Sequence, residues 1–290
     1  MITGSIVALV TPLHSDSLEV DWDALKNLVE WHIEQGTDGI VPVGTTGESA
    51  TVDVKEHCAI VKHTVEVVKG RVPVIAGTGA NSTKEAIYLT QSAKEVGADA
   101  CLLVTPYYNK PNQKGLFEHY KAINDAVDIP QILYNVPSRT GCDLKNETVI
   151  SLSQLSNIIG IKDATGELER INFLKNKVEE NFIFISGDDL SFLEYMKRGG
   201  QGVISVTANI TPALMHTICS HILKADIEKA ENINEKLRSL HQAMFIDSNP
   251  IPVKWLLNHL GLIKQGIRLP LVELDIKYHS VMIEAYEATK

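Results

Sequence analysis

Short runs of consecutive apolar, mostly β-branched residues recur along the chain and alternate with stretches of helical spacing. Runs that are apolar on successive residues are typical of strands buried on both faces of a sheet. There are eight such runs, at residues 6–10, 39–43, 72–76, 100–104, 131–134, 158–161, 182–185 and 202–206. Their regular alternation with helical segments predicts a parallel sheet with a helix after each strand.

Helix signals fill the intervals between these runs. Leu25, Leu28 and Val29 return at the spacing of one helical face, and Gly36 follows as a C-terminal cap. Residues 82–85 read Ser-Thr-Lys-Glu, which matches a capping box, and residues 53–56 open another helix.

The strand pattern stops near residue 226, and three helical segments are expected after it, at 227–245, 252–260 and 271–288. We therefore predict the α/β class: a (β/α)8 TIM barrel over residues 1–225 with a C-terminal helical domain over 226–290. An open doubly wound sheet is the alternative. That fold would carry a glycine-rich phosphate turn after its first strand, where this chain has Thr-Pro-Leu at 11–13.

The composition narrows the range of partners. The 290 residues carry 27 Lys and Arg against 36 Asp and Glu, a formal net charge of −9, and 44% are hydrophobic. These values are ordinary for a soluble globular protein. The acidic balance argues against a nucleic-acid or anionic-membrane surface, because both require a basic face.

The sequence also predicts the cellular location of the protein and the redox state of its cysteines. No apolar run approaches the roughly 18 residues of a membrane-spanning helix. The first ten residues lack the charged start and long apolar stretch of a signal peptide, so we expect a cytoplasmic protein. The cysteines form no CxxC pair and are expected to be reduced thiols; they are Cys58, Cys101, Cys142 and Cys219.

The polar residues after the strands should form the active site, because barrel enzymes build it at the carboxyl ends of their strands. The relevant segments are GTTGE at 44–48, TPYYN at 105–109, YNVPSRTG at 134–141, KDA at 162–164 and GDD at 187–189. They contain one lysine, one arginine, tyrosines and several hydroxyls, but no metal-ligand set and no Ser/His/Asp triad. We expect neither a metal nor a cofactor, and the set suits carbonyl chemistry through an amine. A glycine-rich segment at 77–82 resembles a dinucleotide turn, but Ser82 replaces its third glycine.

Lys162 and Tyr134 are the most informative of these residues. Each ends an apolar strand, where burial would disfavour the charged form of the lysine and leave an amine able to form a Schiff base. A nearby tyrosine could carry the protons that imine formation requires. The alternatives are a buried lysine paired with Asp163 or another acid, and a tyrosine that merely fills the top of the barrel.

Two further segments suit carboxylate binding. Thr45 and Thr46 lie between glycines on a turn that offers hydroxyls and backbone amides. Arg139 can hold a carboxylate bidentately. The alternative for Thr45 and Thr46 is that they simply form a tight strand-to-helix turn. The alternative for Arg139 is a surface ion pair.

Taken in order, the segments at 44–48, 105–108, 134–141 and 160–164, with NPIPVK at 249–254, resemble the dihydrodipicolinate synthase family of pyruvate-dependent class I aldolases. The resemblance runs from residue 3 to residue 270. It implies condensation of pyruvate with aspartate 4-semialdehyde on the diaminopimelate route to lysine. It also implies a homotetramer made of two tight dimers.

The resemblance also implies a role for each matching residue. Lys162 would form the imine with pyruvate, and Tyr134 would relay protons through Thr45 to Tyr108 of a neighbouring subunit. Thr46 would hold the pyruvate carboxylate and Arg139 the semialdehyde carboxylate. Gly187 and Ile204 would line the pocket.

Many bacterial members of this family are inhibited by lysine at a cleft between subunits. The matching positions are Ser49, Ala50, His57, Asn81, Glu85 and Tyr107. Val54 departs from the pattern, since lysine-sensitive members often carry a histidine there.

Two other functions remain open at this point. Another pyruvate lyase of the superfamily, such as N-acetylneuraminate lyase or a 2-keto-3-deoxy sugar acid aldolase, would keep Lys162 and Tyr134 but is not expected to carry Arg139 in this segment. A non-catalytic barrel that binds keto acids would not need the set of Lys162, Tyr134 and Thr45.

Overall fold

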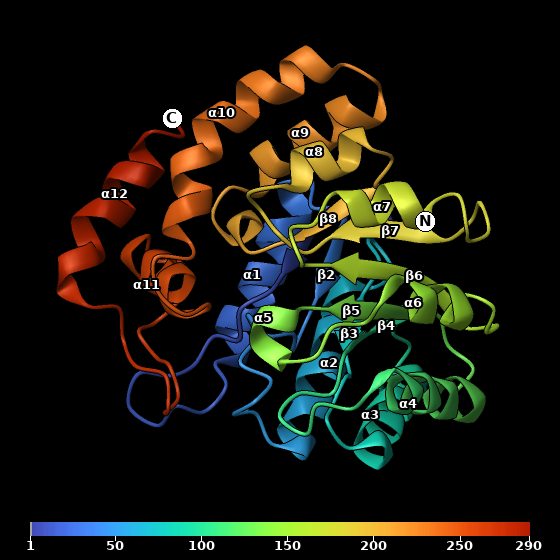
Figure 1. Ribbon diagram of the computed structural model, residues 1–290. Coiled ribbons are helices and arrows are strands. Elements are labelled where there is room, and N and C mark those ends of the chain that lie inside the picture. The colour runs from blue at the N-terminus through green and yellow to red at the C-terminus, as the bar shows by residue number, and fades with distance from the viewer. Residues whose placement is uncertain (1) are drawn as a thin grey trace.

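A computed structural model describes residues 2–290 of the chain, and its core is a parallel β-barrel (Figure 1). The strands are β1 (Gly4–Ala8), β2 (Gly39–Val41), β3 (Ile75–Gly77), β4 (Ala100–Val104), β5 (Gln131–Asn135), β6 (Ile158–Asp163), β7 (Ile183–Ser186) and β8 (Gly202–Ser205). They pair in the order β2-β1-β8-β7-β6-β5-β4-β3, and a bridge between Ile40 and Val74 brings β2 next to β3. The predicted TIM barrel is confirmed.

Helices surround the strands and continue beyond them. They are α1 (Trp22–Glu34), α2 (Val54–Val68), α3 (Thr83–Glu95), α4 (Gln113–Ala126), α5 (Pro137–Thr140), α6 (Asn146–Leu152), α7 (Glu169–Leu174), α8 (Phe192–Lys197), α9 (Pro212–Leu223), α10 (Ile227–Ala243), α11 (Ile251–His259) and α12 (His279–Glu287), with 3₁₀ turns η1 (Thr207–Asn209) and η2 (Ile276–Tyr278). In Figure 1 the last three α-helices, orange to red, form a group at one side of the barrel. Within this group α12 packs against α10 and α11, and α10 also packs against α8 and α9 of the barrel.

Asp21 and Asp53 cap their helices with their side chains, whereas Ser82 does not. The carboxylates of Asp21 and Asp53 accept hydrogen bonds from the backbone amides of Ala24 and Glu56, at 3.1 and 2.9 Å, and so cap α1 and α2. The capping box predicted at 82–85 is wrong in its side-chain bond. Ser82 is the N-cap of α3, but its hydroxyl makes no capping hydrogen bond.

The extension also differs from the prediction in one segment. A single helix was expected over 271–288, but α12 begins only at His279, and the residues before it form a loop that ends in η2. The loop contains the exposed apolar side chains of Val272 and Ile276. Apolar spacing alone made the segment look helical, although no helix face is buried there.

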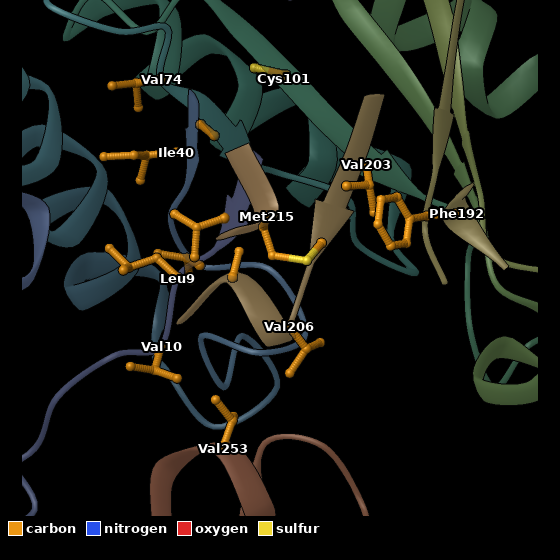
Figure 2. Close-up of a cluster of buried hydrophobic side chains, with 14 of the residues drawn as sticks. Leu9, Val10, Ile40, Val74, Cys101, Phe192, Val203, Val206, Met215 and Val253 are labelled. Atoms are coloured by element: carbon orange, nitrogen blue, oxygen red, sulfur yellow. The ribbon is translucent and has the colours of Figure 1, made fainter. Parts of the chain in front are cut away.

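Two layers of apolar side chains make up the core. The inner layer fills the barrel and includes Ile6, Ile75, Ile132 and Ile185. The outer layer lies between strands and helices, and Figure 2 shows part of it, including Phe192, Val203 and Met215. Figure 2 also shows Val253 of α11, which belongs to the same cluster as Val10 and Val206. The extension therefore shares the hydrophobic core of the barrel.

Candidate active site

The pairing of β5 with β6 brings two of the predicted site residues side by side. Tyr134 and Lys162 are register partners on these neighbouring strands, and side chains alternate across a strand. Leu133 and Ile161 point into the outer core layer, whereas Tyr134 points into the barrel. The amine Nζ of Lys162 lies 4.1 Å from the centre of the Tyr134 ring.

These two side chains line a cavity of about 220 Å³ at the carboxyl ends of the strands. Seven of the predicted site residues meet there: Thr45, Thr46, Tyr134, Arg139, Lys162, Gly187 and Ile204. The wall also contains Ala8, Val41, Gly44, Leu102, Val136, Ser138, Ala164, Asp188, Val206, Phe245 and Asn249. A space of this size, with one amine, one guanidinium and several hydroxyls, suits a small carboxylic acid.

Lys162 is buried without a carboxylate partner. Its residue surface is 6% exposed, and within residues 2–290 no carboxylate oxygen lies within 4.0 Å of its amine. The alternative of a pair with Asp163 is therefore wrong: the Asp163 carboxylate lies 3.4 Å from Arg170 Nε and accepts hydrogen bonds from Thr165. An amine without an ion-pair partner is suited to act as a nucleophile.

A polar network behind the strands holds this arrangement. Arg170 lies between Asp163 and Asp143, and Asn135 donates from Nδ2 to Asp143 Oδ1 at 2.8 Å. Asn135 and Asp163 directly follow Tyr134 and Lys162 on their strands. Burial raises the pKa of Asp163, while the Thr165 hydrogen bonds and the Arg170 charge oppose that rise.

Gly187 gives the lysine its room. A Cβ atom at this position would lie 2.9 Å from Lys162 Cε and 2.7 Å from Ala164 Cβ. Contacts this short require one of the side chains to move. The glycine after β7 is therefore needed for the observed position of the Lys162 side chain.

The hydroxyl of Thr46 is oriented by a residue from the extension. Asn249 donates from Nδ2 to Thr46 Oγ1 at 3.0 Å, and Arg139 donates from Nη2 to the Asn249 carbonyl at 3.3 Å. Because Thr46 Oγ1 accepts from Asn249, its own proton is available to a ligand. Asn249 thus connects the two groups that the sequence suggested for carboxylate binding.

Asn249 and Phe245 line the cavity but had no predicted role, although Asn249 begins the NPIPVK segment that contributes to the family resemblance. Both come from the extension, at least forty positions after the last strand, and no strand-end rule points to them. Asp188 and Ser138 also line the cavity; both belong to the predicted strand-end segments, but no individual role was predicted for them.

Tyr108 and the residues matched to a lysine site lie apart from the cavity. Tyr108 is 89% exposed on the loop after β4, with a positive φ of 74°. The Nε2 atom of His57 is 2.7 Å from the Gly77 carbonyl, and burial lowers the pKa of this histidine. Burial and the Glu85 charge together raise the pKa of Tyr107.

The described part of the chain has neither a metal-binding cluster nor a membrane-spanning helix. Within residues 2–290, no group of three or more His, Cys, Asp or Glu side chains is arranged to hold a metal ion. Over the same residues no helix is long and apolar enough to cross a membrane.

Fold and cavity together define a (β/α)8-barrel enzyme with an amine at the carboxyl ends of its strands. The chain belongs to the dihydrodipicolinate synthetase family, whose model matches residues 1–288. It is 60% identical over 279 residues to the 4-hydroxy-tetrahydrodipicolinate synthase of Cellvibrio japonicus, with 96% of each chain covered. It is 55% identical to the enzyme of the same name from Pseudomonas aeruginosa, with 100% of this chain and 99% of the other covered.

A solved structure agrees with these relatives. The chloride-inhibited dihydrodipicolinate synthase of Acinetobacter baumannii, crystallised with pyruvate, superimposes with a TM-score of 0.97 at 52% identity. The superposition covers 100% of this chain and 99% of the other. The family resemblance predicted from the strand-end segments is confirmed.

Proposed function

We propose that this chain is a 4-hydroxy-tetrahydrodipicolinate synthase, a lyase of lysine biosynthesis that condenses pyruvate with L-aspartate 4-semialdehyde. The observation that carries the proposal is the buried, unpaired Lys162 amine beside Tyr134, in one cavity with Thr46 and Arg139. The names of the relatives point to the same reaction.

The chemistry would start on Lys162. Its amine adds to the keto carbon of pyruvate and water leaves, which gives an imine. Loss of a proton from the pyruvate methyl carbon converts the imine to an enamine. This carbon then bonds to the aldehyde carbon of the semialdehyde. Finally the semialdehyde's own amine attacks the imine carbon, the ring closes and Lys162 is released.

The other residues would bind the substrates and move protons. Thr46 and the adjacent amides hold the pyruvate carboxylate, Arg139 holds the semialdehyde carboxylate, and Gly187 and Ile204 shape the wall. Tyr134 and Thr45 carry the protons of imine formation and release. No further cofactor is required, because the imine itself withdraws the electrons.

Tyr108 would act in a neighbouring subunit. Tyr108 is exposed and does not line the cavity of its own chain, which supports a role across an interface in a homotetramer built as a dimer of dimers. The test mixes Tyr108→Phe subunits with Lys162→Ala subunits. Activity that recovers on mixing supports the shared site, and no recovery places Tyr108 outside it.

Lysine would bind near Ser49, Ala50, His57, Asn81, Glu85 and Tyr107, at the same interface. The Glu85 charge beside Tyr107 suits the ammonium of such a ligand. Val54, at the start of α2, lacks the imidazole that sensitive relatives often carry. A flat activity curve across millimolar lysine would reject this site.

We place the enzyme in the cytoplasm and assign residues 1–225 to the catalytic barrel and 226–290 to the helical domain. The substrate assignment is tested by turnover with two sets of substrates. Condensation of pyruvate with aspartate 4-semialdehyde is expected, without cleavage of N-acetylneuraminate or a 2-keto-3-deoxy sugar acid. The opposite preference would assign the chain to a sugar-acid lyase, and no turnover of either would favour a binding protein.

A further inference from the structure

The loop that contains Thr45 and Thr46 is held in a backbone conformation that its residues disfavour. Val43 and Glu48, on either side of Gly44–Gly47, have positive φ angles of 52° and 59°. A left-handed conformation is uncommon for a bulky residue and is an outlier for a β-branched one. Such conformations persist only where the surroundings enforce them. The loop therefore needs contacts that hold it in place.

The carboxylate of Glu48, which does not line the cavity, supplies such a contact. It forms an ion pair with Lys254 of α11, and both side chains are almost completely buried, at 2% and 4% exposure. Its second oxygen, Oε2, accepts a hydrogen bond from the backbone amide of Arg268 at 3.0 Å. Both partners come from the extension, and Lys254 is 206 residues away in sequence.

The ammonium of Lys254 reaches the same loop by a second route. It donates to the Thr11 carbonyl at 3.0 Å, and Thr11 Oγ1 donates to the Gly47 carbonyl at 2.7 Å. The loop is thus held at two adjacent residues, Gly47 and Glu48. Burial lowers the pKa of Lys254, and the Glu48 charge opposes that change.

The extension is in turn fixed to the barrel beside this pair. Arg268 donates to the Leu18 and Thr51 carbonyls and forms an ion pair with Glu56 on α2. Asn249 holds Thr46 from the cavity side. The loop is therefore attached to the extension at two residues, Thr46 and Glu48.

We propose that Glu48 and Lys254 are a positioning pair, which holds the Gly44–Glu48 loop so that Thr46 and the adjacent amides are arranged to bind the carboxylate of pyruvate. Neither residue lines the cavity, so the pair acts through the loop. The inference rests on the proposed function, since it assumes that pyruvate binds at this loop. The extension would then influence the affinity for pyruvate through its contacts with this loop.

The test separates positioning from stability with the double variant Glu48→Gln/Lys254→Met. Replacing both members of a buried ion pair by neutral groups of similar size commonly leaves stability unchanged. A purely structural pair would then give normal pyruvate binding. We expect instead that the pyruvate concentration for half-maximal borohydride trapping rises by about tenfold or more. Small misplacements of binding groups are known to cause losses of this size. The thermal midpoint should stay near that of the wild type.

Lys264→Met is the matched control. Lys264 is also an extension lysine paired with a barrel carboxylate, Asp21 at 2.8 Å, but that carboxylate caps α1 and does not contact the loop. Glu48→Asp is a second variant, which keeps the charge pair and shortens its reach. If the double variant fails to fold, the test uses Glu48→Asp instead. This variant too should need more pyruvate for half-maximal trapping than Lys264→Met does.

The outcomes distinguish the two proposals. If wild-type protein shows no trapping, the proposed function fails. If the wild type is trapped and the folded Glu48 and Lys254 variants need no more pyruvate than the Lys264→Met control, the positioning role is overturned while the function stands.

Discussion

Lys162 and Lys254 are both withdrawn from solvent, with 6% and 4% of their residue surfaces exposed, yet their surroundings differ in charge. Lys254 forms an ion pair with the Glu48 carboxylate, whereas the Lys162 amine lies beside the Tyr134 ring. The Glu48 carboxylate holds the Lys254 nitrogen in an ion pair outside the cavity, whereas the Lys162 nitrogen lies in the cavity wall, where it can meet the carbonyl carbon of a ligand. Burial alone therefore does not mark a catalytic lysine, and the difference lies in the neighbouring carboxylate.

The largest effect is expected from Lys162→Met, which removes the nucleophile and breaks no ion pair. The loss of kcat/KM should be at least about 10⁴-fold, on the scale seen when a nucleophile is removed. The thermal midpoint should change little. Turnover and a melting curve measure both quantities, and residual activity within tenfold of the wild type would mean that another group forms the covalent bond.

Lys254→Met should have the opposite profile, with its main effect on folding. It leaves the Glu48 carboxylate buried and unpaired, which costs about 3–5 kcal/mol in comparable cases. The free energy of unfolding, measured in urea, is compared between the single variant and Glu48→Gln/Lys254→Met. The double variant should regain most of the loss, and a double variant as unstable as the single one would contradict the ion-pair account.

Tyr134→Phe sharpens the comparison at Lys162, the lysine that we propose to react. The ring and its packing remain, but the hydroxyl that would carry protons is lost, so kcat should fall by about 10²-fold or more. The stability should be nearly unchanged, because the aromatic surface is kept. A kcat within threefold of the wild type would remove Tyr134 from the proton relay.

His32 extends the comparison to a group that burial alone keeps neutral. Burial lowers its pKa to about 3, and its Nδ1 lies 3.0 Å from Thr37 Oγ1. Between that value and the unfolded pKa near 6.5, only the unfolded chain takes up the proton, so stability falls as the pH drops below 6.5. The loss from this group at pH 5 is about 2 kcal/mol.

The measurement is the free energy of unfolding at pH 7 and pH 5, for the wild type and for His32→Gln. The variant cannot take up the proton, so its stability should depend less on pH over this interval. Equal pH dependence of the two proteins would show that His32 is not the group responsible.

Much of the fold and part of the candidate site could be predicted from the amino-acid sequence. The strands fall within a few residues of their predicted bounds, because burial on both faces leaves uninterrupted apolar runs such as 100–104. Lys162 and Tyr134 were found because strand ends meet at one edge of a barrel. These are local signals combined with one topological rule.

The remaining features depend on contacts between distant segments. Nothing in the sequence near Glu48 indicates Lys254 or Arg268, and nothing near Thr46 indicates Asn249. The loop before α12 was predicted as helix because its apolar residues suggested a buried face that tertiary packing does not provide. Side-chain pairing across more than 200 residues follows from the folded arrangement rather than from local pattern.

The most direct test of the difference between the two lysines is borohydride reduction in the presence of pyruvate, followed by peptide mass mapping. Reduction fixes an imine as a 1-carboxyethyl group on the lysine that formed it. We expect this group on the peptide that contains Lys162 and an unmodified peptide at Lys254. An adduct on Lys254, or none on Lys162, would contradict the claim that the unpaired lysine is the one that reacts.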